Sequence, residues 1–439
     1  MTTTLSAAQV ELSKQLGDYW ASTSTSAGAA DFTTIVDTAL IAKENDWIGY
    51  DMYDLITEAA HATLSEERKI SSLSNTLGTL TVLAHSAQIG SGVDYEVHRL
   101  FTASEKRRAL INAAKLSYPA LHKEIRDENK TVGNWLLNGD MEQWAVSTAP
   151  DNWTVYYSTA AQNTTAPYYT RGASSCKLTT ASGWMEQTDT LVPDLRELSG
   201  KTVTFKAKVW CDTASCARLN ISSIGATGTG VDEYSDYHPG SSRFCDGDGE
   251  DEFLEVTATI PEGPQYVKFK VYHAVAAGTT YVDDLRVIGP QRDKVYIGDL
   301  GLAQDRPYRV YQSSDSNIFS EPWALLRDAV VGSDNYLRCG NWTSNYRLRI
   351  VGIGYLDFLA SGAVSTAWTA TIAVDSPQLE ILVAEAAKYL CRQKILPTDN
   401  KGVTDRWKMA YDYWAIECIE RRRRFGMHLP PITINYGSG

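Results

Sequence analysis

A self-contained block of alternating strands lies in the middle of this chain, between two flanks whose apolar residues recur with helical spacing. The block runs from about residue 135 to 290; it opens on Leu136–Trp144 and closes on Thr280–Pro290. Short segments rich in Gly, Pro, Ser, Asn and Asp separate its strands. A β-domain enclosed by another fold is typical of a scaffold that carries an accessory module, which is a different kind of protein from an enzyme.

The bulk properties limit the classes of protein that remain. A length of 439 residues indicates two or three domains, and 43% hydrophobic residues allow each domain to bury a core. The net charge of −12 argues against a free-standing nucleic-acid-binding protein, which needs a basic surface to displace counterions. No segment approaches the roughly 18–20 apolar residues that span a bilayer. The N-terminus lacks a secretion signal, so we expect synthesis in the cytoplasm and no membrane contact.

The seven cysteines are spread along the chain, and their only close pair is Cys211 with Cys216. Neither a C-x-x-C metal knuckle nor a disulfide framework is visible. We therefore expect buried free thiols, with a Cys211–Cys216 disulfide as the alternative.

Helical spacing predicts that the N-terminal flank is largely helical up to about residue 132. Two apolar groups have this spacing. They are Met52, Leu55, Ile56 and Ala59, and then Ile70, Leu73 and Leu77. A further helix is predicted to begin at Ala103 and to be kinked or ended by Pro119, whose ring displaces a carbonyl one turn earlier. Tyr95–Leu100 alternates and is predicted to be a short strand.

The C-terminal flank is predicted to contain β hairpins followed by two helices. Strands are expected at Tyr308–Tyr311 and Arg347–Val351. Ser376-Pro377 is typical of a helix entry, with Ser as the cap and Pro in the first turn. A second helix, ending near Gly426, carries aromatic residues and a cysteine at helical spacing: Trp407, Tyr411, Trp414 and Cys418.

The central block is predicted to be a two-sheet sandwich, because its strands alternate strictly between apolar and polar residues. The clearest examples are Thr202–Val209, Phe253–Ile260 and Val267–Val271. The predicted fold class is therefore α+β and multidomain, with a mainly α-helical body, short β hairpins and an inserted all-β sandwich. The predicted segments are 1–134, 135–290, 291–426 and an extended tail at 427–439.

The two ends of the block resemble jelly-roll modules of the carbohydrate-binding type. The resemblance lies in Asn138–Trp144, Trp153 and Tyr281–Arg286. In those modules the first and last strands lie side by side, and oxygen atoms from both often hold a structural calcium ion. The resemblance therefore implies a calcium site whose candidate ligands are Asp140, Glu142 and one of Asp283 and Asp284.

Physical chemistry is compatible with that site but does not require it. Calcium binds several hard oxygen ligands and tolerates irregular geometry. Neighbouring residues on a strand point to opposite faces, so Asp283 and Asp284 are not expected to bind one ion together. The apolar Leu285 and Val287 would place Asp283 on the inward face. The alternative is that these carboxylates accept hydrogen bonds from backbone donors, and the acidic segment 246–252 is expected to be a solvated loop.

Sugar binding would require exposed aromatic side chains that form a stacking surface. The candidates are Trp184, Trp210, Tyr234, Tyr237 and Tyr272. Aromatic residues of a sandwich are more often part of its core. Because such folds host many functions, the fold alone does not decide between the two.

Two C-terminal features are candidates for partner binding. The run Arg421, Arg422, Arg423 and Arg424 ends a helix, where it complements the helix dipole and has glutamates four residues earlier. A paired helix end, an acidic partner protein and DNA are the three interpretations. In the tail, alternation predicts either a strand that completes a neighbouring sheet or a disordered end. Its candidate residues are Leu429, Pro430, Pro431, Ile432, Ile434 and Tyr436.

The two flanks together resemble the head-to-tail adaptor (connector) proteins of tailed bacteriophages. The residues that carry this resemblance are Phe101–Ala109, Tyr118-Pro119, Ile125–Asp127, Val295–Gly301, Glu385–Leu390 and Trp407–Tyr411. The resemblance implies a homo-oligomeric ring, commonly of twelve copies, at the neck of a virion. Its partners would be the portal protein, tail completion or terminator proteins and DNA that passes without sequence recognition. The acidic net charge suits such a channel, and the sandwich would project outward.

We find no G-x-S-x-G, H-E-x-x-H, P-loop or Rossmann glycine pattern, so the chain is not expected to be an enzyme. The alternative functions are a tail- or fibre-associated virion protein whose jelly roll binds host glycans, or a carbohydrate-binding protein.

Overall fold

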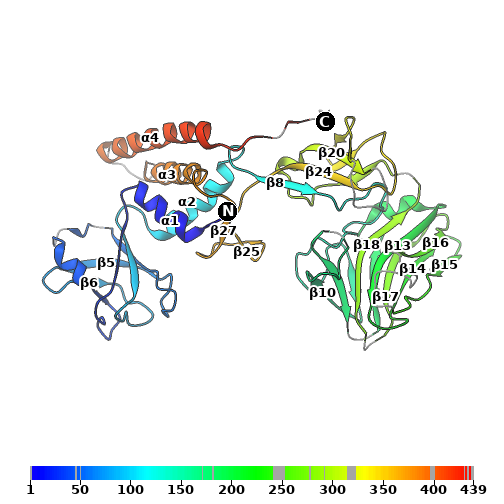
Figure 1. Cartoon of the computed structure of the whole chain (residues 1–439), viewed down its shortest axis with the longest axis horizontal. Helices are drawn as coiled ribbons and strands as arrows, with labels where there is room; N and C mark the ends of the chain where they lie inside the picture. The colour runs from blue at the N-terminus through cyan, green and yellow to red at the C-terminus, as the bar shows by residue number, and fades with distance from the viewer. Residues whose placement is uncertain are drawn as a thin grey trace. The chain divides into compact units, whose positions relative to one another are not determined.

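The chain forms two compact units in a computed structural model (Figure 1). Unit 1 comprises residues 1–123 and 354–429, and unit 2 comprises residues 124–353 and 430–439. The structure describes residues 2–436 except 45–46, 50, 171, 180–181, 241–252, 276–277, 291, 314–322, 396–400, 430 and 433–434. Parts of both flanks lie in unit 1, whereas residues 124–134 and 291–353 are grouped with the central sandwich in unit 2.

Four helices pack together in unit 1, and they come from both ends of the chain. They are α1 (Leu5–Gln15), α2 (Ala103–Leu116), α3 (Leu379–Ile395) and α4 (Lys401–Phe425). Their shared core contains Leu12 of α1, Leu110 of α2, Leu382 of α3 and Trp414 of α4. Figure 1 shows α3 lying along α4. The apolar faces of all four helices are thereby removed from water.

The predicted start of α2 is confirmed, and a capping box explains it. The Thr102 side chain accepts from the Glu105 backbone N–H at 3.0 Å, and the Glu105 carboxylate accepts from the Thr102 N–H at 2.9 Å. Two of the orphan N–H groups of the first turn are thereby satisfied. Of the two outcomes predicted at Pro119, a kink or an end, the structure shows an end, because the helix stops at Leu116.

A buried ion pair holds α2 against the end of α1. The Lys106 ammonium lies 2.8 Å from the Asp18 carboxylate, and neither side chain is exposed. Asp18 also accepts from the backbone N–H groups of Leu100 and Phe101 at 3.0 and 3.2 Å. One carboxylate therefore joins three segments of unit 1, and its charge is compensated as burial demands.

Unit 1 also contains two sheets and a short 3-10 helix, Thr38–Ala42. A six-stranded sheet has the order β2-β7-β4-β5-β6-β3. Its strands are β2 (Trp20–Thr23), β3 (Thr34–Val36), β4 (Tyr53–Ile56), β5 (Glu67–Ser74), β6 (Thr79–Val82) and β7 (Asp94–His98). A smaller sheet contains β1 (Thr3–Thr4), β25 (Leu359–Ala360), β26 (Ala363–Val364) and β27 (Thr371–Ile372).

The predicted fold class is therefore wrong: the body outside the sandwich is not mainly α-helical. Two predicted helices are the strands β4 and β5, whereas the strand predicted at Tyr95 is confirmed as β7. In β4 both Leu55 and Ile56 are buried, and a strand buried on both faces does not alternate. In β5 the pairing shifts between Ile70 and Ser72, so Ile70 and Leu73 both reach the core at a helix-like spacing.

The centre of unit 2 is a sandwich of two five-stranded antiparallel sheets (Figure 1). One sheet has the order β10-β11-β18-β13-β16 and the other β15-β14-β17-β12-β9. The strands are β9 (Thr154–Tyr156), β10 (Thr159–Asn163), β11 (Ser175–Thr179), β12 (Gly183–Thr188), β13 (Thr202–Cys211), β14 (Ala217–Ile224), β15 (Gly230–Tyr234), β16 (Leu254–Thr259), β17 (Tyr266–His273) and β18 (Thr280–Ile288). The inserted all-β jelly-roll-like sandwich predicted from the sequence is confirmed.

The inner faces of these sheets supply one apolar core. Phe205 of β13 and Phe269 of β17 meet edge to face at 5.5 Å between ring centroids, and both are fully buried. Edge-to-face contact places the positive edge of one ring against the negative face of the other. Each alternate residue of β17 faces this core, as the alternation in Val267–Val271 predicts.

Two smaller sheets complete unit 2. One contains β21 (Trp323–Leu325), β20 (Pro307–Ser313), β24 (Leu348–Gly354) and β8 (Lys123–Asp127). The other contains β19 (Lys294–Tyr296), β23 (Tyr336–Arg338), β22 (Val330–Val331) and β28 (Asn435–Tyr436). Both hairpin strands predicted in this region, in β20 and β24, are confirmed.

All six described cysteines are buried free thiols, whereas Cys245 lies outside the described residues. Cys211 and Cys216 both approach the Thr280 hydroxyl, at 3.6 and 2.9 Å, without a disulfide. No helix in the described part of the chain is both long and apolar enough to cross a membrane.

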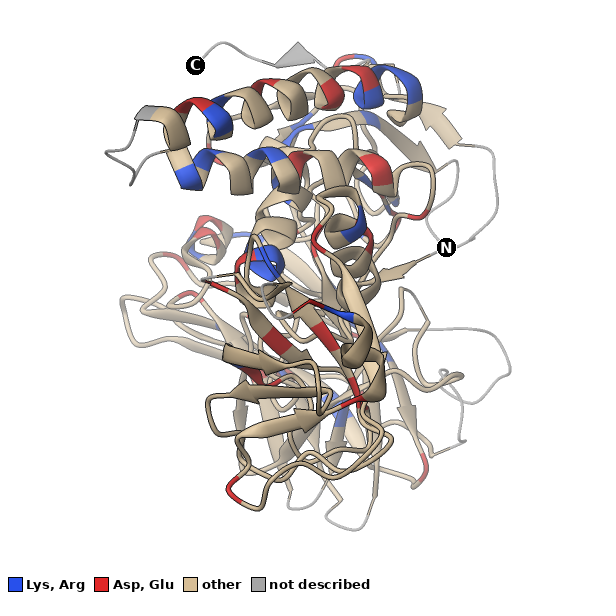
Figure 2. Ribbon diagram, turned by 90° about the vertical axis from the view of Figure 1, so that its left-hand side faces the viewer, with Lys and Arg blue, Asp and Glu red and all other residues tan. Residues whose placement is uncertain are grey.

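Charged residues of both signs lie along α3 and α4 (Figure 2). Arg421 contacts Glu417 at 3.0 Å and Glu380 of α3 at 2.8 Å. Arg422 contacts the buried Glu385 at 2.6 Å. The next two residues of the run are exposed. Arg421 and Arg422 thus form ion pairs between α4 and α3.

We expect the double substitution Arg421→Ala with Arg422→Ala to lower the free energy of unfolding of unit 1 by about 1–3 kcal/mol, because it leaves the buried Glu385 with less compensation. The matched change, Arg423→Ala with Arg424→Ala, removes the same charge from exposed positions and should cost under about 0.5 kcal/mol. Urea unfolding followed by circular dichroism measures both. Equal effects of the two pairs would contradict a structural role for Arg421 and Arg422.

Candidate functional site

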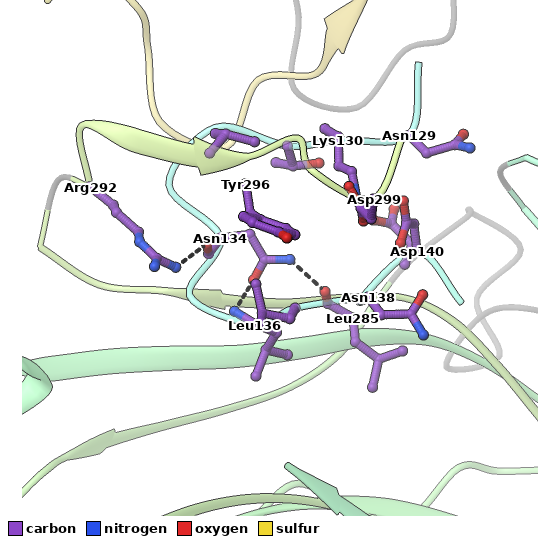
Figure 3. A pocket seen from close by; sticks show the side chains of 15 residues that line it. Asn129, Lys130, Asn134, Leu136, Asn138, Asp140, Leu285, Arg292, Tyr296 and Asp299 are labelled. Carbon is purple, nitrogen blue, oxygen red and sulfur yellow. Dashed lines mark hydrogen bonds and ion pairs between the residues drawn. The ribbon is translucent and has the colours of Figure 1, made fainter. Parts of the chain in front are cut away.

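The first predicted calcium ligand, Asp140, lies at a small pocket of about 40 Å³ in unit 2 (Figure 3). Its carboxylate is 3.7 Å from the Lys130 ammonium, which also contacts Asp299 at 2.5 Å. Burial alone would lower the pKa of Lys130, but the charges of Asp140, Asp299 and Asp127 outweigh it and raise that pKa. A lysine ammonium therefore supplies the positive charge between these carboxylates.

The other three candidate ligands have protein partners of their own. Glu142 accepts from the backbone N–H groups of Ala173 and Ser174, both at 2.9 Å. Asp283 accepts from the Thr170 N–H at 2.6 Å and its hydroxyl at 2.8 Å. Asp284 binds Arg286 through both carboxylate oxygens at 2.7 Å each.

The expectation that Asp283 faces inward with Leu285 is wrong. Tyr281 and Asp283 pair with Trp210 and Lys208 on the outer side of β13, whereas Val282 and Leu285 lie in the core. The register shifts between Lys206 and Lys208, opposite Asp284, whose φ is +50°. This bulge changes which residues face the core. Asp283 is nevertheless buried, with Thr170 as its partner.

These four carboxylates do not converge on one point as a calcium site requires. Among the described residues, no group of three or more His, Cys, Asp or Glu side chains is arranged to hold a metal ion. Glu142, Asp283 and Asp284 match the alternative in which protein donors satisfy the carboxylates, whereas one oxygen of Asp140 is buried without a hydrogen-bond partner among the described residues. The calcium ion stays a prediction.

A different surface gathers the aromatic candidates: the outer face of the sheet β15-β14-β17-β12-β9. Alternation turns Trp184 of β12 and Tyr272 of β17 outward, and the register places them opposite each other. Tyr156 of β9 is paired with Trp184, and Arg218 of β14 is paired with Tyr272. We call this surface the aromatic face. Its aromatic members are Tyr156, Tyr157, Trp184, Tyr234, Tyr237, Tyr266 and Tyr272.

Successive rings of the aromatic face are in contact. Tyr156 stacks on Trp184 at 5.4 Å between centroids, and Trp184 lies 5.6 Å from Tyr272. Tyr272 lies 5.8 Å from Tyr234 of β15. Tyr157, which is 74% exposed, also contacts Trp184 at 5.4 Å. A row of aromatic rings therefore crosses the sheet perpendicular to its strands.

Polar and charged groups lie beside this row. Glu186 accepts from the Trp184 indole N–H at 2.9 Å and from the Lys268 ammonium at 3.3 Å. Asp232 accepts from the Asn220 amide at 2.9 Å and from the Tyr234 hydroxyl at 3.1 Å. Burial, aided by the neighbouring Tyr272 and Asp232, raises the pKa of Tyr234, so this hydroxyl stays protonated and can donate.

An open hollow of about 470 Å³ lies on the same face of the sheet. Its lining includes Ser222, Asp232, Tyr234, Lys270 and Tyr272. Hydroxyl, carboxylate and ammonium groups therefore surround a space whose walls also contain ring faces. Such a surface can bind a ligand that has both apolar C–H faces and hydroxyl groups.

Four of the five predicted stacking residues lie on the aromatic face, but Trp210 does not. Trp210 lies on β13 in the opposite sheet, where Tyr168 and Tyr281 pack on it at 4.7 and 5.3 Å. The sequence prediction missed Tyr156, Tyr157, Arg218 and Lys270. The alternation of β17 contained a signal for Lys270, because a strand whose Phe269 and Val271 face the core must turn the residue between them outward.

The predicted partner-binding residues are divided between the two units. In unit 1, Arg421 and Arg422 form the ion pairs described above, whereas Arg423 and Arg424 are exposed. Leu429 and Ile432 are 49% and 57% exposed. Pro431 accepts from Arg309 at 3.2 Å through its carbonyl. Pro430 and Ile434 lie outside the described residues.

The predicted terminal strand exists, and it pairs within its own chain. Asn435 and Tyr436 form β28, which runs parallel to Val330 and Val331 of β22. The backbone of this strand therefore completes a sheet of unit 2, and addition to a neighbouring molecule stays a prediction.

Comparison with known proteins gives structural likenesses and no family. No protein-family model matches the chain, and no curated protein matches it. One similar solved structure is the enzymatically active domain of tailspike protein 4 of bacteriophage CBA120, with a TM-score of 0.26 and 15% identity. That match covers 36% of this chain and 21% of the tailspike chain, so the chain spans about a fifth of it.

Two further similar structures are carbohydrate-binding modules. A family 16 module has a TM-score of 0.26 and 15% identity, covering 35% of this chain and 99% of the module. The C-terminal family 22 module of Clostridium thermocellum Xyn10B has a TM-score of 0.26 and 12% identity, covering 38% of this chain and 96% of the module. These likenesses are of fold only, and at such TM-scores they carry no inference about function.

The carboxylates near the small pocket predict a pH-dependent stability of unit 2. Burial, with the charges of Asp140 and Asp127 adding to it, raises the pKa of Glu142 from 4.5 to about 7. The folded state therefore holds a proton that the unfolded state has released between these values, and its stability falls as pH rises through them. Glu142→Gln keeps an acceptor for Ala173 and Ser174 but cannot titrate. Between the two pH values we expect its free energy of unfolding to fall by about 1–2 kcal/mol less than that of the unsubstituted protein.

Urea unfolding of the full chain at pH 5, 6, 7 and 8 measures the effect. The control is Glu255→Gln, at an exposed position of β16. An unchanged slope in the Glu142→Gln protein would show that this carboxyl is not the group that titrates.

Proposed function

We propose that unit 2 binds a glycan on the aromatic face. The observation that carries this proposal is the row of rings from Tyr156 through Trp184 and Tyr272 to Tyr234, with centroid separations of 5.4, 5.6 and 5.8 Å. A pyranose ring presents C–H groups on one face and hydroxyls on its rim. Aromatic rings attract the C–H face by dispersion, and neighbouring polar groups accept or donate at the rim.

The position of these rings favours a ligand over a structural role. The core of the sandwich is already filled from the inner faces, by residues such as Phe205, Phe269 and Leu219. Tyr156, Tyr157 and Tyr237 are 39%, 74% and 43% exposed. Aromatic side chains that stay in contact with water on one face of a sheet suit a binding surface.

A carboxylate group in the same area would give the surface its specificity. Asp232 and Asn220 lie on neighbouring outward positions of β15 and β14, next to the hollow. The Asn220 side-chain carbonyl has no hydrogen-bond partner among the described residues. Asn220 is fully buried and does not line the hollow, so the carboxylate that a ligand in the hollow can reach is that of Asp232.

We also propose that this glycan-binding protein is part of a virion. The flanks resemble phage neck proteins in sequence, and a glycan-binding face would suit a tail- or fibre-associated virion protein that contacts host polysaccharide. The head-to-tail adaptor ring, with its portal contacts and DNA channel, has no support beyond that sequence resemblance. Glycan binding is the function that the geometry supports better.

Glycan binding predicts a specific loss on truncating the row. We expect Trp184→Ala or Tyr272→Ala in the full chain to weaken binding to a retained polysaccharide at least about tenfold, equivalent to about 1.4 kcal/mol. Trp210→Ala, an aromatic truncation on the opposite sheet, is the matched control and should leave the affinity unchanged. Affinity electrophoresis in gels that contain xylan, galactan, alginate or carrageenan measures this.

Retention by none of these polysaccharides, or an equal loss in all three variants, would contradict the proposal. Circular dichroism of each variant separates a loss of binding from a loss of folding.

We propose a second function, self-association, for unit 1. The side of α4 that faces away from α3 carries apolar side chains at helical spacing. Met409, Tyr413, Ile416 and Ile419 are 73%, 56%, 62% and 66% exposed. The opposite side of α4, with Trp407, Trp414 and Cys418, packs in the core. An exposed apolar stripe of this kind is typical of an interface between proteins.

Charge complementarity favours a second copy of this chain as the partner. Asp405 and Arg423 are exposed and lie nine residues before and after Trp414. Consider an antiparallel pair of α4 helices whose two-fold axis crosses each helix at the level of Trp414. In such a pair, each Asp405 would approach the Arg423 of the other copy. Isologous contacts of this kind are the commonest in homo-oligomers.

Self-association predicts a charge-swap rescue. We expect Tyr413→Lys with Ile416→Lys to abolish the dimer, and Asp405→Arg to weaken it at least about fivefold, because it places like charges together. Adding Arg423→Asp to Asp405→Arg should restore association. Sedimentation velocity measures the oligomeric state, with the exposed Val364→Lys as a control. A protein that is monomeric at all concentrations, or a dimer whose association does not change with these substitutions, would contradict self-association through α4.

A further inference from the structure

Two cations on the aromatic face contact ring faces rather than carboxylates. The Arg218 guanidinium carbon lies 4.0 Å from the Tyr234 centroid, 4.7 Å from that of Tyr237 and 5.7 Å from that of Tyr272. The Lys270 ammonium lies 6.0 and 5.9 Å from the centroids of Trp184 and Tyr272. Cation–π contacts hold a charge in place without neutralising it.

The carboxylates of the same face are engaged elsewhere. Glu186 accepts from Trp184 and Lys268, and Asp232 accepts from Asn220 and Tyr234. Within the part of the chain that the structure describes, no ion pair joins either carboxylate to Arg218 or Lys270. Glu186 is the cross-strand neighbour of Lys270 in the register of β12 and β17, so Arg218 is the cation more available to a ligand.

Arg218 is prepared for an anion in a further way. Its Nε atom is buried and has no hydrogen-bond partner among the described residues. Three tyrosine rings fix the position of the guanidinium group, so little side-chain entropy remains to be lost on binding. A planar guanidinium with free N–H groups matches the two oxygens of a carboxylate or sulfate.

The two cations are also close to each other on the sheet. Arg218 pairs directly with Tyr272, and Lys270 is the outward residue two positions along the same strand β17. Diagonal neighbours of this kind are about 7–8 Å apart at their Cα atoms. The face carries carboxylates as well, namely Glu186 and Asp232, so the pair of cations is a local feature of Arg218 and Lys270 and not of the whole face.

We infer that the glycan bound by this face is acidic, and that Arg218, with Lys270 beside it, binds the carboxylate of a uronic acid or a sulfate ester. This inference rests on the proposed glycan binding and adds the chemical class of the ligand. The row of rings would hold the sugar faces, while the guanidinium and ammonium groups select for the anionic substituent.

The test compares anionic and neutral polysaccharides on the full-length chain. We expect alginate, polygalacturonate or carrageenan to bind at least about tenfold more tightly than xylan or β-1,4-galactan, and the difference to shrink as salt is raised. Binding of the two polyuronates alone would assign a carboxylate, and binding of carrageenan alone would assign a sulfate ester. Polyphosphate is the control for a surface that binds any polyanion.

Substitution of Arg218 separates charge from stacking. Arg218→Gln should weaken binding to the acidic polysaccharide at least about tenfold more than it weakens binding to the neutral ones. Arg218→Lys should restore part of the affinity, because it keeps the charge but loses the planar fork. Lys177→Gln is the matched control, since Lys177 lies 5.8 Å over the Tyr281 ring on the opposite sheet.

Equal affinity for acidic and neutral polysaccharides, with the Trp184→Ala loss intact, would overturn the acidic ligand and leave glycan binding standing. Equal binding of polyphosphate would also overturn it. Retention by no polysaccharide would overturn glycan binding itself. Arg218→Lys is also a control for misfolding. If Arg218→Gln loses binding to neutral glycans and Arg218→Lys keeps it, Arg218 has a structural role and the inference is contradicted.

Discussion

The packing of the two inner sheet faces is the constraint on which the rest of unit 2 depends. Phe269 of β17 is buried against Phe205 of β13, and Val271 follows it into the same core. Because side chains alternate along a strand, the inward orientation of Phe269 and Val271 turns Lys270 and Tyr272 to the outer face of the sheet. A slip of one residue would reverse both faces, so the core that stabilises the sandwich also sets which residues form the aromatic face.

Buried ion pairs have a different role, because they fasten irregular segments where strands and helices end. Lys130 lies between Asp140 and Asp299, and Lys106 lies against Asp18. Each pair compensates charges that would be costly to bury alone. Of the acidic residues near the ends of the sandwich, Asp140 and Asp284 have cationic partners, whereas Glu142 and Asp283 accept hydrogen bonds from backbone and hydroxyl donors.

Local patterns in the sequence predicted the strands and helices that have one buried face and one exposed face. Strict alternation identified the strands with one buried face, such as β13 and β17, and the Thr102–Glu105 capping box begins the predicted helix α2. The prediction was wrong for β4 and β5, because one is buried on both faces and the other contains a bulge. In both cases the periodicity that separates strand from helix is lost.

The sequence by itself determined that aromatic residues such as Trp184, Tyr234 and Tyr272 are available in an alternating, two-faced domain. It could not separate them from Trp210, nor join them to Tyr156 and Arg218, since these residues are far apart along the chain. Only the tertiary structure decided that, because strand order and register place residues from β9, β12, β17, β14 and β15 side by side. Sheet pairing is a long-range property that depends on the whole core, and no local pattern specifies it.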